Sequence, residues 1–449
     1  MKRYSTLKPS GNDWLGDIPD GWEVKRLKYI SYTRVSNVDK KSEDEIQVKL
    51  CNYVDVYKNE FITEKIDFMI ATATRRQVDA FELKKGDVIL TKDSETPDDI
   101  GIPAYVDLED TKNIVCGYHL AISTPINSVL LGKYLFRLIQ SNIFRSYFEV
   151  SSNGITRYGL DTYSIFNADI LLPSFSEQRI IADFLDRETG KINHLISKKQ
   201  KLIDLLKEER TAIINQAVTK GINPYVEMKD SGIEWLGKIP ENWHLVPMKK
   251  YLNSVVDYRG KTPTKKENGE VFLVTARNIK DGIINYTLSQ EYISKDEYTQ
   301  VMQRGKPIIG DVLFTTEAPL GEVANVDRED IALAQRIIKF RANPKYLDNY
   351  YLKEWLSSQS FQNDLQSYAT GSTALGIKAS KLNFLKLLLP PLSEQKKILI
   401  HINKEREKID ASIVKIEKEI DLLKEYRTAL ISEVVTGKID VRQEVAVWI

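Results

Sequence analysis

The chain contains one long pattern twice, and this duplication constrains its fold more than any other feature. Residues 171–178 read "LLPSFSEQ" and residues 388–395 read "LLPPLSEQ", 217 residues later in a chain of 449. A tryptophan box, "DWLGDIPDGW" from Asp13, returns in the same place before the second phrase as "EWLGKIPENW" from Glu234. Self-similarity with a fixed order of segments indicates that one structural unit is built twice.

A coiled-coil pattern follows each repeated phrase. Apolar residues recur at alternating spacings of four and three, which is typical of long paired helices. In each copy a serine lies two or three residues after a proline and directly precedes Glu-Gln, which predicts that Ser176 and Ser393 cap the two helices.

Charged residues interrupt the two seams at equivalent positions, namely Glu188, Arg210, Glu405 and Arg427. An antiparallel pairing lets Glu188 meet Arg427 and Glu405 meet Arg210, whereas a parallel pairing brings like charges together. We therefore expect an antiparallel helix pair whose register is fixed by these polar residues. The alternative is that the four side chains lie at the edge of the seam and extend into solvent.

The segments between the tryptophan boxes and the phrases differ most and show strands, turns and short helices. The pattern predicts an α+β chain, with two pseudo-repeated α/β domains joined by two long antiparallel coiled-coil helices in a pseudo-twofold, circular arrangement. The expected parts are residues 1–175, the helix 176–221, residues 222–392, and the helix and tail 393–449. We expect the box tryptophans to pack where each domain joins the helices rather than to stack on a ligand. They are Trp14, Trp22, Trp235 and Trp243.

Composition indicates the cellular compartment of the chain but does not indicate what the chain binds. The 64 basic and 63 acidic residues give a net charge of +1, which neither predicts nor excludes nucleic-acid binding, because clustering matters more than the total. Cys51 and Cys116 are far apart, so we expect a reducing cytoplasm and no disulfide or zinc site. No apolar run is long enough for a membrane span or a signal peptide.

Catalytic and metal-binding motifs are missing from the sequence. "RGKT" at 259–262 ends like a P-loop, but Val255 stands where the first glycine is required. The four histidines are scattered, and the signature of adenine methyltransferases is absent. We therefore expect no catalytic or metal site in this chain. Two similar domains on a helical spacer favour a protein that reads two short DNA features one helical turn or more apart.

The doubled "WLG.IP..W", the paired "LLP..SEQ", the endings "DLLKE.RTA" and the loops "GITRYGL" and "GSTALGI" resemble the specificity subunit of type I restriction–modification systems. The resemblance covers essentially the whole chain. It implies two target-recognition domains that read the halves of a split, asymmetric double-stranded DNA sequence, with the helices setting the gap. It also implies two modification subunits that carry S-adenosylmethionine, and restriction subunits that use ATP and Mg²⁺, so that this chain holds no cofactor. A stand-alone nuclease or methyltransferase and a two-headed protein adaptor are the alternatives.

DNA recognition needs Lys and Arg for phosphates, and Arg, Lys, Asn or Gln for base edges. On residue type and loop placement we expect DNA contacts in the first domain from Arg75, Arg76, Gln77, Lys92, Asp93, Thr156, Arg157 and Tyr158. In the second domain the expected contacts are Tyr258, Arg259, Lys261, Lys265, Lys266, Arg277, Asn278, Gln335, Arg336, Ser372, Thr373 and Lys378. For each of them the alternative is a solvated surface side chain. The four acids around Lys92 oppose a phosphate contact there, and the alternative for them is to accept a hydrogen bond from cytosine N4.

Overall fold

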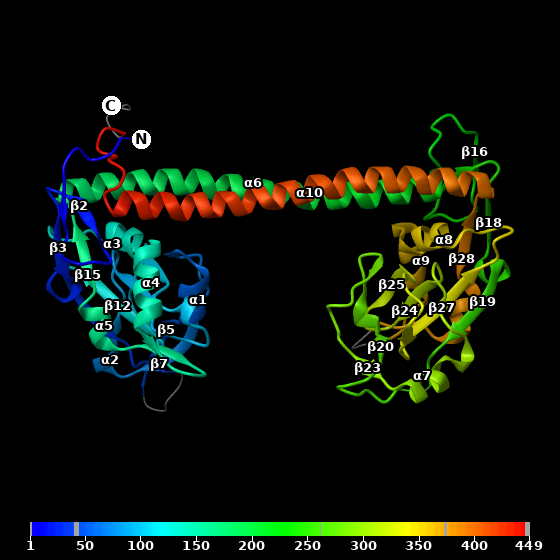
Figure 1. The fold of residues 1–449 in the computed structure, drawn as a ribbon, viewed down its shortest axis with the longest axis horizontal. Coiled ribbons are helices and arrows are strands. Elements are labelled where there is room, and N and C mark those ends of the chain that lie inside the picture. Colours follow the sequence, from blue (N-terminus) through cyan, green and yellow to red (C-terminus); the bar gives the residue numbers. More distant parts are fainter. Residues whose placement is uncertain (1, 40–44, 261, 372–374, 445–449) are drawn as a thin grey trace. The chain divides into compact units, whose positions relative to one another are not determined.

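A computed structural model describes residues 2–39, 45–260, 262–371 and 375–444 of the chain. The chain divides into two compact units, residues 1–199 with 417–449 and residues 200–416. The long helices α6 (Phe175–Lys220) and α10 (Leu392–Val435) each contribute one half to each unit (Figure 1). Within the described ranges, no helix has the length and apolar character needed to cross a bilayer.

The two long helices pack against each other in opposite directions inside each unit. In the first unit the beginning of α6 and the end of α10 share one core, which includes Ile181, Leu185, Leu430 and Val434. In the second unit the end of α6 and the beginning of α10 share another, which includes Ala217, Val218, Ile398 and Ile402. The prediction of two α/β units on long antiparallel helices is confirmed.

The predicted partners of the charged seam residues are wrong. Arg210 Nη1 donates to Asp410 Oδ1 at 2.8 Å, and Arg427 pairs with Glu60. Glu188 and Glu405 instead pair with basic residues on their own helices, namely Arg187, Lys191 and Lys408. Long arginine side chains reach out of the seam, so the nearest carboxylate need not be the residue directly opposite.

Both helices begin earlier than the serine pattern predicts. Ser174 caps α6, because its Oγ accepts the N–H of Glu177 at 3.3 Å and its carbonyl accepts the N–H of Gln178. In α10 the carbonyl of Pro391 accepts the corresponding amides. The predicted capping residues Ser176 and Ser393 therefore lie inside the first turns.

The first unit is built on a five-stranded sheet in the order β4-β12-β8-β10-β6, in which only the pair of β10 and β6 is parallel. Its strands are β4 (Ser31–Val35), β12 (Leu120–Pro125), β8 (Val88–Thr91), β10 (Pro103–Val106) and β6 (Phe61–Ile62). A second sheet has the order β11-β5-β7, with β11 (Ile114–Cys116), β5 (Ile46–Cys51) and β7 (Met69–Ala73). The helices are α1 (Tyr53–Lys58), α2 (Arg75–Phe81), α3 (Gly132–Ile139), α4 (Asn142–Ser151) and α5 (Thr162–Phe166).

The second unit repeats this plan with a four-stranded antiparallel sheet in the order β19-β27-β24-β25. Its strands are β19 (Leu252–Asp257), β27 (Ile337–Ala342), β24 (Val312–Thr316) and β25 (Leu320–Asn325). The second sheet has the order β23-β20-β26, with β23 (Tyr292–Ile293), β20 (Val271–Val274) and β26 (Ile331–Leu333). Small strands β21 (Ile279–Lys280) and β22 (Ile283–Ile284) lie beside β25, and the helices are α7 (Lys295–Val301), α8 (Asn349–Ser357) and α9 (Gln359–Tyr368). In Figure 1, α3 and α8 each lie between the helix pair and the sheet of their unit.

Short ribbons connect each unit to its long helix. In the first unit β15 (Asp169–Leu172) pairs with β3 (Glu23–Arg26), and β1 (Leu7–Pro9) pairs with β2 (Asp17–Pro19). In the second unit the equivalent pairs are β18 (His244–Pro247) with β28 (Lys386–Leu389), and β16 (Met228–Asp230) with β17 (Lys238–Pro240). Lys2 and Asp440 form a bridge in the first unit, so the segment before β1 pairs with the segment after α10, as the circular arrangement requires.

The glutamine of the repeated phrase explains why the phrase occurs twice. The Gln178 side chain is fully buried, and its Nε2 donates to the carbonyls of Val129 (2.9 Å) and Pro173 (3.0 Å). Its Oε1 accepts the N–H of Leu131 at 2.8 Å. The glutamine thus joins the start of α6 to the loop before α3.

Gln395 makes the equivalent joint in the second unit. Its Nε2 donates to the carbonyls of Tyr346 (2.9 Å) and Pro390 (2.8 Å), and its Oε1 accepts the N–H of Asp348 at 2.9 Å. Because every polar atom of the amide is used inside the protein, the residue type at this position is fixed by the joint.

The tryptophan boxes close the other ends of the long helices. Trp22 and Trp243 are buried, and Trp14 is half-buried against Tyr147, with ring centroids 5.0 Å apart. Trp235 is 40% exposed, so the prediction of core packing is wrong for this residue. A Cβ on Gly437, just after α10, would lie 2.4 Å from Pro19 and 3.4 Å from Trp22. A Cβ on Gly221, just after α6, would lie 3.4 Å from Trp243.

The equivalent aspartates before β8 and β24, Asp87 and Asp311, have pKa values that are shifted in opposite directions. Asp311 is buried and accepts from Lys339 Nζ at 3.0 Å and from Arg341 Nε at 2.7 Å. Burial opposes ionisation of Asp311, but the hydrogen bonds from Arg341, from the N–H of Ile308 and from Lys339 outweigh it and lower the pKa. Asp87 accepts the backbone N–H of Lys84, and burial raises its pKa.

Candidate nucleic-acid interface

Three chain segments meet at the end of β8 in the first unit. The N–H of Lys92 donates to the carbonyl of His119 at 2.8 Å, and the N–H of Leu160 donates to the carbonyl of Lys92 at 2.9 Å. The short strand β9 (Asp93–Ser94) then pairs with β14 (Tyr158–Leu160), with Gly159 opposite Asp93. A Cβ on Gly159 would lie 2.9 Å from Asp93 Oδ1, so glycine permits this close approach.

The side chains at this junction form a connected polar cluster. Asp93 Oδ2 accepts from Lys92 Nζ at 2.6 Å and from His119 Nδ1 at 2.9 Å. With its Nδ1–H donated to the carboxylate, His119 has Nε2 as acceptor for Arg157 Nη2, 2.9 Å away. Burial alone would raise the pKa of Asp93, but the hydrogen bonds from Lys92 and His119 outweigh it and lower this pKa. Asp93 therefore stays charged at neutral pH and holds two basic side chains at the surface.

The same three segments meet in the second unit. The N–H of Thr316 donates to the carbonyl of Arg336 at 2.9 Å, and the N–H of Ile377 donates to the carbonyl of Thr316 at 3.0 Å. Glu317 forms a backbone bridge with Gly376, as Asp93 does with Gly159. Arg336 Nε lies 2.8 Å from Glu317 Oε1, and both side chains are half exposed. The Asp93–His119 pair of the first unit is thus replaced by a Glu317–Arg336 pair.

A fourth segment joins the junction in the second unit. Arg259 is held by Asp257 through three contacts of 2.6 to 3.0 Å, and its Nη1 donates to the carbonyl of Ile377 at 2.9 Å. Thr262 Oγ1 donates to Gln335 Oε1 at 2.7 Å. The structure therefore brings together the predicted residues Arg259, Gln335 and Arg336 beside the second glycine loop.

Three predicted contacts have structural roles instead. Gln77 closes a capping box with Thr74 at the start of α2, and its Nε2 donates to Asn37. Asn278 is fully buried, closes a capping box with Thr275 and donates to the carbonyls of Asn285 and Ser289. Tyr258 is buried and donates its hydroxyl to the carbonyl of Gly305. Asn278 and Tyr258 face the protein interior, and the amide of Gln77 is used by the capping box and Asn37, so as found these side chains are not available to bases, which corrects their assignment.

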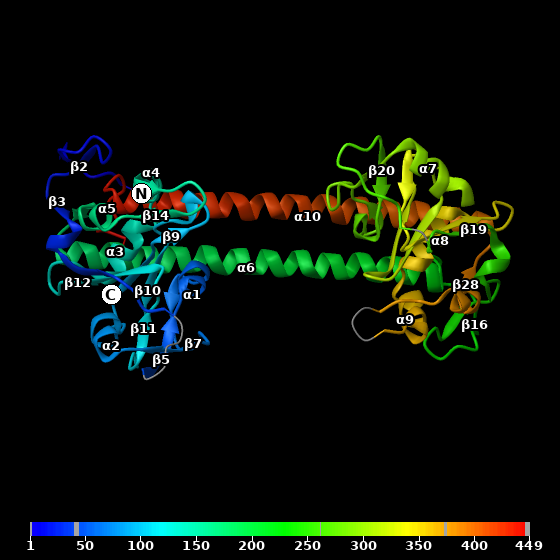
Figure 2. The same ribbon diagram turned by 90° about the horizontal axis from the view of Figure 1, so that it is seen from below.

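The remaining predicted residues lie on the surface, outside the two junctions or at their edges. Arg75 pairs with Asp79 at 3.1 Å, and Figure 2 shows α2 well apart from β9 and β14. Thr156 is exposed at the tip of the first glycine loop, next to half-buried Tyr158. Lys265 pairs with Glu291 at 2.7 Å. The other exposed side chains are Arg76, Lys266, Arg277 and Lys378. Lys261, Ser372 and Thr373 lie outside the described residues.

Sequence reasoning missed Tyr118, His119 and Glu317. Tyr118 is 48% exposed and packs edge-on against His119, with ring centroids 4.7 Å apart. The sequence contained a signal for all three. When the two copies of the repeat are aligned, Tyr118-His119 corresponds to Gln335-Arg336, and Glu317 corresponds to Asp93. Across the described ranges, no group of three or more His, Cys, Asp and Glu side chains is arranged to hold a metal ion.

Comparisons with known proteins identify the family. The family model of the type I restriction modification DNA specificity domain matches residues 19–205 and again residues 240–421. The chain is 24% identical to the type I restriction enzyme MjaVIII specificity subunit of Methanocaldococcus jannaschii, over 95% of this chain and 94% of the relative. It is 21% identical to the EcoKI specificity subunit of Escherichia coli K12, over 90% and 86% of the two chains.

A solved structure from work on complex assembly and conformational transition of the type I R-M system has the same fold. Its TM-score is 0.68 at 14% identity, with 94% of this chain and 99% of that chain covered. The two family matches cover most of this sequence and coincide with its internal duplication. The chain therefore belongs to the family of type I restriction–modification DNA specificity subunits.

Proposed function

We propose that this specificity subunit selects an asymmetric bipartite DNA target, with each unit reading one half-site through its glycine-loop junction. One observation carries the proposal: both units have the same backbone junction, but Asp93 and His119 occupy it in one and Glu317 and Arg336 in the other. A shared geometry indicates the same kind of ligand, and different side chains indicate different bases.

The chemistry of the junctions suits base edges. The guanidinium groups of Arg157 and Arg336 can donate two hydrogen bonds to guanine, and the carboxylates can accept from cytosine N4. In the free protein Arg157 pairs with His119, and Arg336 pairs with Glu317. These pairs hold the side chains in place at the surface of each junction. DNA binding would exchange the internal pairs for contacts with bases, while exposed lysines such as Lys266 contact phosphates.

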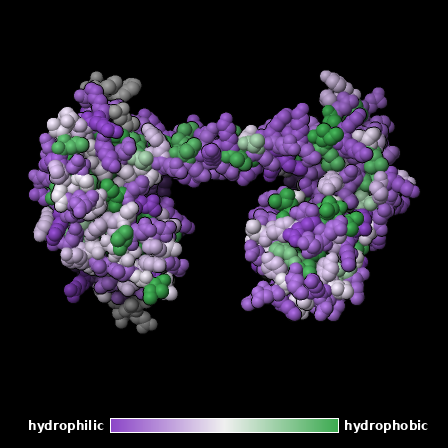
Figure 3. Space-filling model, viewed as in Figure 1, coloured by the Kyte–Doolittle hydropathy of each residue, from purple (hydrophilic) through white to green (hydrophobic). Residues whose placement is uncertain are grey.

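The catalytic steps are proposed to belong to partner subunits. Two modification subunits would bind S-adenosylmethionine and methylate adenine N6, and restriction subunits would use ATP and Mg²⁺, all in the cytoplasm. The long helices offer contact surfaces for them and would set the gap between half-sites. The face of the helices seen in Figure 3 is mainly hydrophilic. The helices also carry exposed apolar residues such as Leu205 (50%), Val414 (64%) and Leu422 (54%).

Genome-wide mapping of methylated adenine tests the proposal. The host keeps the modification subunit and either carries or lacks this gene. We expect one split, asymmetric motif to lose methylation without the gene, and Arg336→Ala to relax only the half-site read by the second unit. An unchanged methylation pattern, in a host whose modification subunit is active with another specificity subunit, would favour a protein adaptor instead. A palindromic motif would contradict the asymmetry.

A further inference from the structure

A buried ion pair joins the first unit to α6. We call the part of each unit outside the two long helices its head, and the ion pair that joins a head to the long helix that follows it in the sequence its lock. Arg137 on α3 is 1% exposed, and its Nε and Nη2 donate to Asp186 Oδ1 on α6 at 3.1 and 2.8 Å. Lys133, one turn earlier on α3, donates to the other oxygen of Asp186 at 3.0 Å. The head of this unit therefore presents positive charge to a negative position on the helix that follows it.

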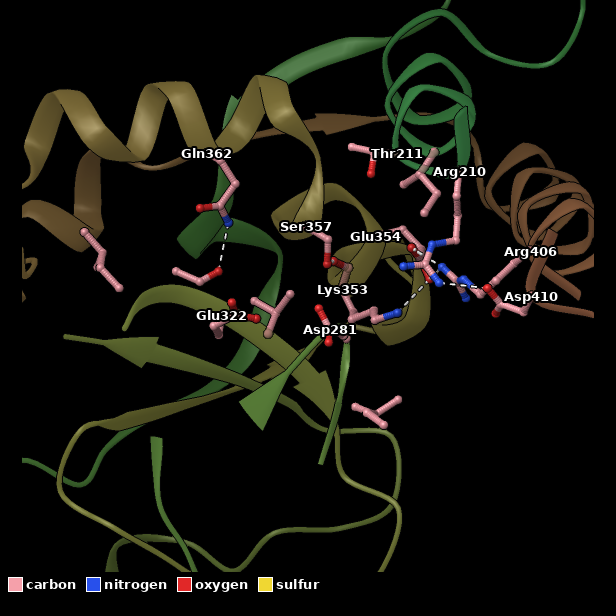
Figure 4. Close-up of a pocket in the computed structure, with 16 residues that line it drawn as sticks. Arg210, Thr211, Asp281, Glu322, Lys353, Glu354, Ser357, Gln362, Arg406 and Asp410 are labelled. Carbon is pink, nitrogen blue, oxygen red and sulfur yellow. Dashed lines mark hydrogen bonds and ion pairs between the residues drawn. The ribbon is translucent and has the colours of Figure 1, made fainter. Parts of the chain in front are cut away.

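The second unit has a lock of opposite sign. Glu354 on α8 is 3% exposed and accepts from Arg406 Nη2 on α10 through both oxygens at 2.7 Å. Lys353 Nζ donates to the same carboxylate at 2.9 Å. Figure 4 shows Arg406 reaching from α10 toward Glu354 at the wall of a cavity of about 600 Å³. Here the head presents negative charge to a positive position on its following helix.

The duplication aligns the two locks residue by residue. Arg137 is equivalent to Glu354, Asp186 to Asn403, and Thr189 to Arg406. Thr189 is buried and donates its hydroxyl to the carbonyl of Leu185, so it contributes no charge. If the first head lay on the second helix, Arg137 would face Arg406. If the second head lay on the first helix, Glu354 would face Asp186 and lack Arg406. Each buried charge would keep a partner in its own head, Glu60 at 3.6 Å for Arg137 and Lys353 at 2.9 Å for Glu354. It would lose its shorter ion pair to the helix and gain a like charge nearby, which is destabilising.

We propose that Arg137–Asp186 and Glu354–Arg406 are positioning pairs that make each head and the first four or so turns of its following helix one matched set. The exchangeable specificity module of this chain is then the head together with the helix start, up to Gly190 or Glu407. A crossover within the repeated phrase would separate the two members of each pair, although the phrase itself is nearly identical in both copies. This inference rests on the proposed function, because the module is defined by the half-site that it reads.

Two chimeras of the full chain test the inference, each carrying a second copy of the first head. In the short exchange, residues 19–178 replace 240–395, so the junction falls in the phrase. In the long exchange, residues 19–190 replace 240–407. Each is expressed with the modification subunit, and adenine methylation is mapped. We expect the long exchange to methylate an inverted repeat of the first half-site, and the short exchange to do so at least about tenfold less.

A rescue identifies the cause. Asn403→Asp with Arg406→Thr should restore the short exchange, whereas the exposed pair Lys404→Thr with Glu407→Asp on the same helix should not. Equal methylation by both exchanges would overturn the inference. The wild-type chain in the same host distinguishes failure of the proposed function from failure of the further inference. If the wild-type chain directs methylation of no split motif, the proposed function is rejected without the chimeras.

A transplant in the wild-type chain decides the point even if both chimeras are inactive. One half of the transplant, Lys353→Phe with Glu354→Arg, gives α8 the residues that α3 has at the equivalent positions. The other half, Asn403→Asp with Arg406→Thr, gives α10 the residues that α6 has at the equivalent positions. We expect each half alone to lower the Tm of the second unit by roughly 6–20 °C and the four changes together to restore most of it. A four-residue variant whose loss equals the sum of the two halves would show independent sites and overturn the matched set.

Discussion

Gln178→Met gives the sharpest test of how each unit is joined to its helix. Methionine has a similar size and no polar hydrogen-bonding group, so the change mainly removes the three hydrogen bonds of the buried amide. It leaves the N–H of Leu131 and the carbonyls of Val129 and Pro173 without this partner.

The magnitude follows from these groups. An unsatisfied buried polar group costs about 1–3 kcal/mol. Val129 is 38% exposed, so its carbonyl can be rehydrated, and the total should be about 2–5 kcal/mol. For a unit of this size the Tm of the first unit should fall by roughly 4–20 °C.

Thermal unfolding followed by circular dichroism, with hydrogen exchange to assign each transition to a unit, provides the measurement. Gln395→Met should have the same effect on the second unit. Gln200→Met, at an exposed position on α6, is the matched control and should change stability by less than about 0.5 kcal/mol. If Gln178→Met behaved like this control, the glutamine joint would not hold the helix to the domain.

The first two of three further predictions use the equivalent position in the other unit as a control. Gly437→Ala should destabilise the first unit by more than Gly221→Ala destabilises the second in chemical denaturation, because both have positive φ but only the first meets an atom within 3 Å. Asp311→Asn should lower the free energy of unfolding by about 3–5 kcal/mol at pH 7. The lowered pKa of Asp311 means that this stabilisation is present above the unfolded value near 3.9 and is lost as the pH falls through the folded pKa, so the variant and wild type should converge in acid unfolding curves. Asp87→Asn, where burial raises the pKa, should be neutral or stabilising at pH 7. Arg157→Ala should weaken binding of the assembled complex to DNA with the correct first half-site by about 1–3 kcal/mol in titrations, and a loss equal on all DNA would indicate a phosphate contact.

The long helices could be predicted from the periodic spacing of apolar residues, and the two units could be predicted from the internal duplication of the sequence. A seam of apolar residues fixes helix pairing through burial alone, and the duplication reports the second unit. The partners of Arg427 could not be found this way. Glu60, its actual partner, lies in the variable part of the first unit, where the two copies of the repeat differ most.

Residue type alone named several side chains that the structure brings to the two junctions, such as Asp93, Arg157 and Arg336, and their role in DNA binding stays a prediction. The errors at the side chains that it misplaced have a common cause. Gln77 and Asn278 are suitable base readers, but each lies three residues after a threonine that caps a short helix, and the capping box uses their amides. That spacing is visible in the sequence and marks a structural role. His119 was missed because a histidine without other metal-ligand residues gives no motif, and only its alignment with Arg336 marks its position.

The division of the chain into units has a consequence for its synthesis. The second unit is continuous, whereas the first needs residues 417–449 to complete its core. At about 5–20 residues per second, those residues leave the ribosome roughly 10–50 s after the first 199. Throughout that interval the apolar seam of early α6, including Ile181, Leu185 and Ile192, has no partner helix from its own chain. The second unit can therefore finish folding first, and the amino-terminal half of the nascent chain is the part exposed to aggregation and to chaperones.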